Sequence, residues 1–273
     1  MKIPVCLCAI LIIFFASCKK DSPANETVDP PVPPEVVKSD LSIEFDNRIR
    51  DQELHLNIEP YTGVIYSETY TFTALRYYIS NVSLTNTGDT VYTVPQDSCY
   101  FLVDQSDFNT RFVNVKVPVG DYKTLTFIVG VDSLRSTMNM SKRTGILDPV
   151  TGANGMYWGS DSGYIFFNAE GTSSASPEPG NIFTYHIGGY GGNTIPVINN
   201  LKTITLDLSA HGIAEVRTGT KSNIHLFVDI SNIFDNRGQP VSIAQHPIVG
   251  YSEFSTNIAY NYSSMFHHNH TEN

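Results

Sequence analysis

Apolar and polar residues alternate with a period of two along much of the chain. Residues 41–45, 113–117 and 224–230 each place apolar side chains on one face and polar side chains on the other, which is the pattern of a half-buried β-strand. Alternation, or a run of β-branched and aromatic residues, predicts further strands at residues 54–58, 70–75, 77–84, 100–103, 125–131, 164–167, 182–186 and 203–208. Gly, Pro, Asn or Asp separates most of these segments, so the chain is predicted to consist mainly of strands joined by turns.

Helical patterns are few. Residues 257–266 carry apolar side chains at helical spacing, which predicts one short amphipathic helix, and residues 231–236 suit a single helical turn. Strands and helices do not alternate, so a parallel sheet covered by helices is not expected. We expect an all-β fold in which antiparallel sheets pack as a β-sandwich, either immunoglobulin-like or jelly-roll-like. No repeat or second linker interrupts the pattern, so one domain from residue 39 to residue 273 is predicted.

The first 18 residues have the features of an export signal. Lys2 precedes an apolar run from residue 3 to residue 16, which is too short to span a bilayer. The residues up to Cys18 read Phe-Ala-Ser-Cys and resemble the lipobox of bacterial lipoproteins. The resemblance implies a signal peptide at residues 1–17 and an acylated Cys18 that anchors the protein to a membrane. An ordinary signal peptide with an incidental Cys is the alternative.

A proline-rich segment follows the cysteine. Residues 19–38 contain five of the chain's 15 prolines, which favours an extended tether between Cys18 and the domain. Lys19-Lys20-Asp21 resembles the surface-export signals of Bacteroidetes lipoproteins. We therefore expect a lipid-anchored protein of the cell envelope, attached to the outer membrane and facing the periplasm or the cell surface.

Composition narrows the function classes. The chain has 17 Lys and Arg against 27 Asp and Glu, a formal net charge of −10, so it lacks the excess of cations that nucleic-acid binding needs. Aromatic residues make up 11% and charged residues 16%, which argues against a disordered chain. Once the signal peptide is removed and Cys18 is acylated, Cys99 is the one remaining thiol, so no intrachain disulfide is expected. Cys99 adjoins an apolar strand and is predicted to be buried and unreactive.

Histidines are the main candidates for chemistry, because no catalytic signature occurs and we do not expect an enzyme. His186 ends a predicted strand just before a glycine-rich segment. His225 lies on the polar face of its strand, where Asp229 is placed to orient its ring toward a metal. Three more imidazoles come near the end, and in an extended chain the second and third of them share a face: His267, His268 and His270. Structural histidines and a solvated tail are the open alternatives.

The most distinctive stretch, residues 145–171, reads GILDPVTGANGMYWGSDSGYIFFNAEG. It resembles the MbnP-like domain, a copper-binding family named for a methanobactin-associated protein, whose members carry Leu-Asp-Pro, then Gly-Met-aromatic-Trp, then Gly-Tyr and Glu-Gly. Further segments in the same order are similar to the family: residues 76–82, 102–104, 117–122, 129–133, 186–188 and 224–230. The resemblance covers about residues 41 to 270.

The resemblance implies an exported all-β domain that binds copper. It also implies a di-haem enzyme as partner, which oxidises a tryptophan to kynurenine and so replaces a poorly donating indole by an aryl amine. By position Trp158 is the candidate, with Met156, His186 and His225 as possible neighbours in the metal site. Members often carry a second Trp where this sequence has Ser160. If the second Trp is the one that is oxidised, the modified site cannot form in this chain.

A different function remains open at this point. Many exported β-sandwiches bind glycans or proteins without a metal, and this chain has 15 Tyr residues that can stack on sugars. The positions of the side chains discriminate between the two functions. An exposed row of Tyr favours glycan binding, whereas histidines converging on Trp158 favour a metal.

Overall fold

The computed structural model describes residues 36–58, 60–159, 162–192 and 197–273. They form one compact unit, Val36–Asn273. The expected signal peptide, Cys18 and most of the tether lie outside the described residues, as does Ser160. No helix in the described ranges has both the length and the apolar character needed to cross a membrane.

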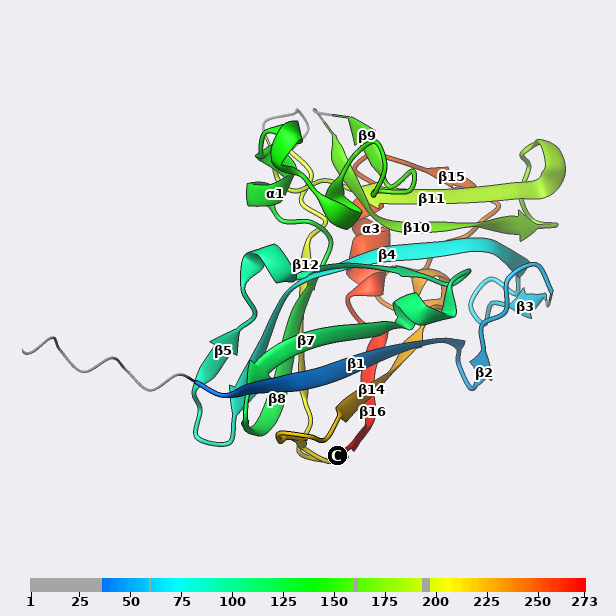
Figure 1. Ribbon diagram of the computed structural model, residues 1–273. Coiled ribbons are helices and arrows are strands. Elements are labelled where there is room, and N and C mark those ends of the chain that lie inside the picture. The colour runs from blue at the N-terminus through cyan, green and yellow to red at the C-terminus, as the bar shows by residue number, and fades with distance from the viewer. Residues whose placement is uncertain (1–35, 59, 160–161, 193–196) are drawn as a thin grey trace, which may run out of the picture. The chain divides into compact units, whose positions relative to one another are not determined.

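The first sheet has five strands (Figure 1). In spatial order they are β16 (Phe266–Glu272), β14 (Ser222–Asp229), β1 (Lys38–Ile49) and β2 (Gln52–Glu53), and β7 (Phe112–Pro118) also pairs with β1. The predicted alternation holds in β1, where Leu41, Ile43 and Phe45 are fully buried. β1 and β14 pair in parallel, with Leu41 opposite Ser222, although these two residues lie far apart in the sequence. This sheet is therefore mixed and not purely antiparallel as predicted.

The second sheet has eleven strands. Its main order is β12 (Lys202–Asp207), β8 (Gly120–Val129), β4 (Thr69–Asn86), β10 (Gly163–Ser173), β11 (Ile182–Gly188) and β15 (Ile248–Val249). Five short strands extend it: β3 (Tyr61–Thr62), β5 (Val91–Thr93), β6 (Tyr100–Asp104), β9 (Tyr157–Gly159) and β13 (Ala214–Val216). β4 is the longest strand and pairs with both β8 and β10, so it connects the two halves of this sheet.

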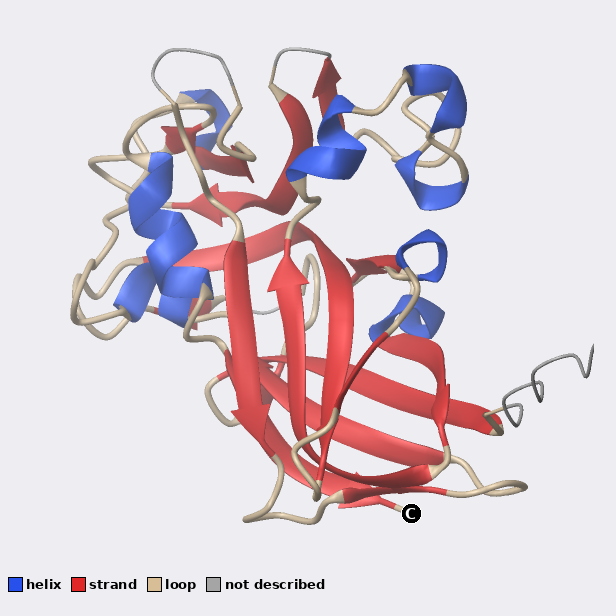
Figure 2. Ribbon diagram, turned by 90° about the vertical axis from the view of Figure 1, so that its left-hand side faces the viewer, coloured by secondary structure: helices blue, strands red, loops and turns tan. Residues whose placement is uncertain are grey.

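The two sheets pack face to face around the main core, and the predicted all-β sandwich is confirmed. Phe45 from the first sheet meets Phe127 and Tyr77 from the second, with ring centroids 5.5 and 6.3 Å apart. Figure 2 shows the strongly curved strands, with the helices gathered toward one end of the unit. Because both sheets present apolar faces to the same interior, the sandwich buries large side chains without a disulfide.

The helices are short and lie in the connections. The α-helices are α1 (Ser133–Thr137), α2 (Asn232–Asp235) and α3 (Ser255–Tyr262), and the 3₁₀ turns are η1 (Gln96–Ser98), η2 (Phe108–Arg111), η3 (Met140–Lys142), η4 (Gly145–Leu147) and η5 (Pro179–Asn181). A second, smaller core lies beneath the connections around η4 and includes Tyr78, Leu147, Met156 and Tyr164.

Three sequence predictions were wrong in detail. Residues 54–58 form no strand, because Leu54 enters the core and Asn57 then takes a φ of +63°, which ends an extended run. The strands predicted at 70–75 and 77–84 are one strand, β4. The helix predicted at 257–266 ends at Tyr262, and the chain re-extends into β16 at Phe266. Cys99 is fully buried, as predicted, and burial raises the pKa of its thiol to about 11.

Asp132, which caps α1, connects several elements through hydrogen bonds to its carboxylate. Its carboxylate accepts hydrogen bonds from the Tyr100 hydroxyl (2.6 Å), the Asn81 side-chain amide (2.8 Å) and the Arg135 backbone N–H (3.0 Å). Burial alone would raise the pKa of Asp132, but these hydrogen bonds outweigh it and hold the pKa below its ordinary value. The charged carboxylate therefore stabilises the fold.

Replacing Asp132 by Asn is expected to destabilise the protein in a pH-dependent way. A carboxyl with a lowered folded pKa stabilises the fold above its unfolded pKa of about 3.9, and this stabilisation is lost as the pH falls through the folded pKa. Urea unfolding of Asp132→Asn should show a deficit at pH 7 that shrinks below about pH 4. Asp40→Asn is the control, because Asp40 pairs with Lys116 at an exposed position. A deficit independent of pH would contradict the expectation.

Candidate functional site

Polar side chains form a row across the outer face of β4, β10 and β11. Arg76 pairs with Asn168, and Asn168 pairs with His186. Residues directly opposite each other on neighbouring strands project to the same face. Alternation along β11 places Phe183, Tyr185 and Ile187 in the main core, so His186 projects away from it.

His186 is held by a carboxylate. Its Nε2 lies 2.7 Å from Oε1 of Glu170, and the Asn168 side-chain amide donates to the same oxygen at 3.0 Å. Burial would raise the pKa of Glu170, but the hydrogen bonds from His186 and Asn168 outweigh it and lower the pKa. The side chains of His186 and Glu170 are 29% and 35% exposed, so the pair is half-buried and open to a ligand. A carboxylate on one ring nitrogen fixes the ring and leaves the other nitrogen for a metal.

Trp158 lies against β11, the strand that carries His186. β9 pairs with β10, and a Cβ built on Gly188 would lie 2.7 Å from Cζ3 of Trp158. The indole also meets the Tyr251 ring edge-on, at 6.3 Å between centroids. Gly188 follows His186 by two positions on β11, a spacing of about 7 Å that keeps the same face. The structure therefore brings Trp158 and His186 to one region.

Arg76 ties the loop before Trp158 to this face. Its Nη1 donates to the Asn154 carbonyl at 2.5 Å. The segments singled out in the sequence therefore meet in space, although they lie far apart along the chain: residues 76–82, 154–158, 168–171 and 186–188. Met156 belongs to these segments and is fully buried in the smaller core, against which Trp158 also packs, so its thioether is shielded from solvent.

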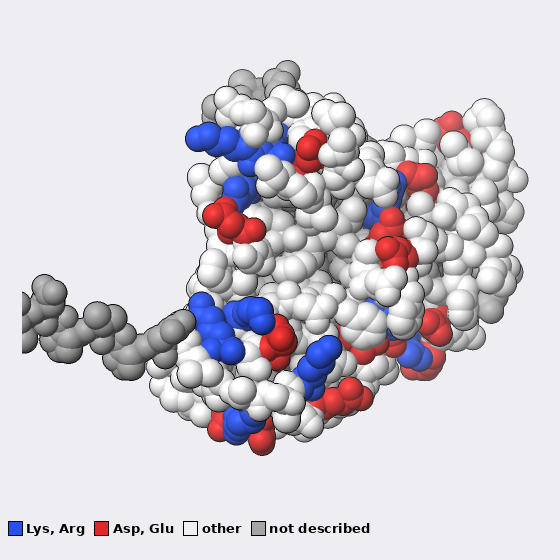
Figure 3. Space-filling view, viewed as in Figure 1, with Lys and Arg blue, Asp and Glu red and all other residues white. Residues whose placement is uncertain are grey.

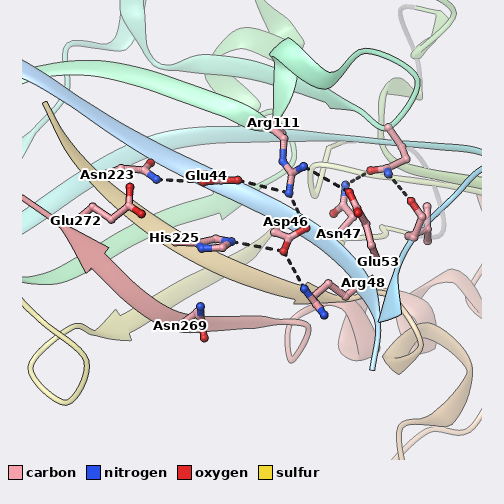
Figure 4. A network of polar contacts seen from close by, with 12 residues as sticks. Glu44, Asp46, Asn47, Arg48, Glu53, Arg111, Asn223, His225, Asn269 and Glu272 are labelled. Atoms are coloured by element: carbon pink, nitrogen blue, oxygen red, sulfur yellow. Dashed lines mark hydrogen bonds and ion pairs between the residues drawn. The ribbon is translucent and has the colours of Figure 1, made fainter. Parts of the chain in front are cut away.

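His225 lies in the other sheet, on β14, and is not brought to His186. Its ring meets that of His270 on the adjacent β16, with centroids 4.8 Å apart and planes at 74°. Its Nε2 is buried without a hydrogen bond, and the nearest carboxylate oxygen, Oδ2 of Asp46, lies 3.5 Å away (Figure 4). Two of the predicted metal ligands are thus paired, away from Trp158.

The surroundings of His225 are those of a salt-bridge network. Asp46 accepts from Arg111 at 2.5 Å and from Arg48 at 3.1 Å, so two guanidinium groups already occupy the carboxylate beside the imidazole (Figure 4). Nearby cations oppose a bound metal ion. Asp229, expected to orient His225, instead accepts from the backbone N–H of Arg50 and from Ser231.

The three histidines near the C-terminus, His267, His268 and His270, do not converge on one point. His267 is exposed. A β-bulge at Asn269 shifts the register, because His225 pairs with His270 but the next residue of β14 pairs with His268. His268 consequently meets His211, with ring centroids 6.0 Å apart, while His270 meets His225. The prediction that His268 and His270 share a face is therefore wrong.

Taken over the described residues, no group of three or more His, Cys, Asp and Glu side chains is placed to hold a metal ion. The tyrosines are also informative, because in the described ranges Tyr66 and Tyr260 are the exposed ones, at 43% and 52%. They do not form the exposed row that glycan binding predicts. The sequence suggested either histidines converging on Trp158 or an exposed row of tyrosines. In the described residues one histidine, His186, lies near Trp158, and no exposed tyrosine row is found there.

Sequence reasoning missed two residues of these sites. Glu170 lies in the Glu-Gly segment, but the strand predicted there ended at residue 167, whereas β10 continues to Ser173 and places Asn168 and Glu170 on one face. Asp46 carried no local signal, since it reaches His225 through the long-range parallel pairing of β1 with β14.

Comparison with known proteins gives two matches. The family model for MbnP matches residues 38–254 of the chain. The solved structure described as MbnP from Methylosinus trichosporium matches with a TM-score of 0.55, covering 80% of this chain and 83% of that chain at 15% sequence identity. At this identity the structural similarity concerns the fold alone. No curated protein matches the sequence.

Proposed function

The chain belongs to the MbnP family, and from that membership we propose that it is an exported copper-binding protein of the cell envelope, which acquires or chaperones copper. The observation that carries the proposal is that Trp158 packs against Gly188, two residues along β11 from the His186–Glu170 pair. We propose a binding protein and not an enzyme, because this region contains a ligand-like imidazole and no nucleophile–base pair.

His186 is the residue best prepared to bind a metal. The Glu170 hydrogen bond fixes one ring nitrogen and increases the basicity of the ring. Imidazole nitrogen is a ligand that copper accepts readily. The half-buried position lets an ion arrive from solvent while the carboxylate supplies negative charge close by.

The donor set fits copper only if Trp158 is oxidised. The indole nitrogen's lone pair belongs to the ring π system, so an unmodified indole adds almost nothing to His186. Kynurenine would offer an aryl amine and a carbonyl from the same position. We therefore propose Trp158 as the substrate of a di-haem tryptophan-oxidising partner, despite Ser160 in place of the second Trp.

His225 and His270 are the second place to look for copper. Their paired rings and the unpartnered Nε2 of His225 suit an ion with two ligands. The guanidinium groups on Asp46 weigh against this location, so we place it behind His186. Export and the lipid anchor on Cys18 stay predictions, which the mass of the mature N-terminus would decide.

The copper content of protein isolated from its native cells should follow the oxidised fraction of Trp158. Elemental analysis gives the copper per chain, and the mass of the Trp158 peptide from the same sample gives the oxidised fraction. His186→Ala should lose copper while Trp158 remains oxidised. Glu170→Gln should weaken copper binding about 10–100-fold, as is usual when the partner of a metal-bound His is removed.

His225→Ala and His270→Ala are the matched controls, since they remove the same chemical group from the other sheet. Both should keep their copper. Loss of copper in these variants with retention in His186→Ala would move the site to the first sheet. Absence of copper from protein with oxidised Trp158, after reconstitution at neutral pH, would overturn the proposed function.

A further inference from the structure

A cavity of about 370 Å³ opens on the side of the second sheet where the short helices gather. One wall is formed by four residues from the end of η1 and the start of β6: Asp97, Ser98, Tyr100 and Phe101. The other wall is formed by Arg135 and residues 142–147, which run from η3 to η4. The volume lies in the range of about 300–1,000 Å³ that is usual for small-molecule sites. The cavity shares no lining residue with the proposed copper site, since His186, Glu170 and Trp158 do not line it.

Positive charge is concentrated around this cavity. Arg135, Lys142 and Arg143 line it, against the one carboxylate of Asp97. The lining thus carries three cations and one acid, in a chain where acids outnumber cations by 27 to 17. Figure 3 shows Lys and Arg side chains gathered over the part of the surface that carries α1. The local sign of charge is thus opposite to that of the whole protein.

Arg143 is a buried cation without a carboxylate partner. It is 5% exposed. Its guanidinium donates to the carbonyls of Ser136 (2.7 Å) and Met138 (2.9 Å) and to the Tyr157 hydroxyl (3.1 Å), all of them neutral acceptors. Within the described ranges, no Asp or Glu lies at ion-pair distance from it. The guanidinium also lies over the rings of Tyr157 and Tyr164, 5.5 and 5.7 Å from their centres, which orders it without neutralising it. Buried charges in proteins are normally paired with an opposite charge, and the contacts of Arg143 include no carboxylate.

The other two cations are only weakly compensated. Arg135 pairs with Asp97, whose side chain is 92% exposed, and an exposed ion pair of this kind holds its partners together only weakly. Lys142 is exposed and has no ion pair with any described residue. The guanidinium of Arg135 also lies 5.3 Å from the centre of the Tyr100 ring, which orders it without neutralising it.

Part of the remaining lining is apolar. Phe101, Ile146 and Leu147 contribute side chains to the same cavity. A ligand that fits must therefore combine an anionic group with an apolar body. An inorganic anion would leave the apolar wall in water, and a neutral apolar molecule would leave the cations unbalanced.

We propose that this cavity binds a small organic anion whose carboxylate or phosphate group is held by Lys142 and Arg135 beside Arg143, while its apolar body packs against Phe101 and Ile146. Guanidinium and ammonium groups recognise both kinds of oxyanion. The proposal is independent of copper binding, because the two sites share no lining residue.

Ligand-observed NMR titrations of the purified protein test the proposal. Benzoate and phenyl phosphate combine each kind of anionic group with an apolar ring, acetate and inorganic phosphate lack the ring, and benzyl alcohol lacks the charge. We expect benzoate, phenyl phosphate or both to bind at least tenfold more tightly than the other three probes. Which of the two binds better identifies the anionic group. Failure of both aromatic anions to bind, or equal binding of acetate and benzoate, would overturn the proposal.

Substitutions locate the binding. Lys142→Gln and Arg135→Gln should each weaken binding of the better aromatic anion about tenfold, as expected for the loss of one charged contact. Lys221→Gln removes an exposed cation elsewhere and should leave binding unchanged. Thermal unfolding of each variant verifies that it is folded, and Lys142, being exposed, can be replaced without disturbing the core. Binding that is unchanged in both Lys142→Gln and Arg135→Gln would show that the anion binds somewhere else.

Discussion

Phe45→Ala is expected to lower the free energy of unfolding by about 3–5 kcal/mol, the usual cost of removing a fully buried Phe side chain. Phe45 is 0% exposed, and its ring meets the rings of Phe127, Tyr77 and Phe266 at centroid distances of 5.5, 6.3 and 6.2 Å. These neighbours belong to β8, β4 and β16, so one substitution leaves a cavity between the two sheets. Rigid strands on both sides limit how far the cavity can collapse.

Urea unfolding of protein with unoxidised Trp158 measures this loss, with the fluorescence of this one tryptophan of the chain as the signal. Phe108→Ala is the matched control, because Phe108 is 64% exposed and its ring contacts Phe112 and the Arg111 guanidinium. It should cost less than about 1 kcal/mol. Equal losses in the two variants would mean that the sandwich interface does not supply the stability assigned to it.

Local alternation was enough to predict most of the sandwich. Side chains of β7, β12 and β14, and of β1 as far as Phe45, alternate between the common interior and the outside, and the sequence shows the same period of two. The prediction failed where one local feature ended an extended segment, as the left-handed Asn57 does after Leu54. It also failed to give the parallel pairing of β1 with β14, because alternation is the same for parallel and antiparallel neighbours.

The candidate site was only half predictable for the same reason. Trp158 and His186 were both chosen from the sequence, but their proximity depends on β9, β10 and β11 lying side by side. His225 was chosen equally well, and the fold placed it in the other sheet beside Asp46. The bulge at Asn269 then determined that His270, and not His268, lies beside His225. Residue type thus suggested ligands, whereas strand order and register decided which of them meet.

Gly188 contributes both to the packing of β11 on β10 and to the position of Trp158, because its lack of a Cβ leaves room for both neighbours. An Ala Cβ at this position would lie 2.4 Å from the Tyr164 carbonyl oxygen and 2.7 Å from Cζ3 of Trp158. The carbonyl belongs to the backbone of β10 and cannot move without disturbing its strand pairing. Gly188 has no left-handed φ, so Ala fits the backbone and the conflict is purely one of space.

Gly188→Ala is therefore expected to destabilise the protein by about 3 kcal/mol, at the upper end of the range for overpacked sites, and to displace the indole from β11. The displacement should appear as a red shift of the Trp158 emission in the folded protein, since the ring becomes more exposed. Gly250→Ala is the control, because a Cβ there meets nothing within 4 Å, and it should change neither stability nor emission. If Gly188→Ala left the emission unchanged, Trp158 would not rest on the strand that carries His186, and the geometric basis for a shared copper site would be lost.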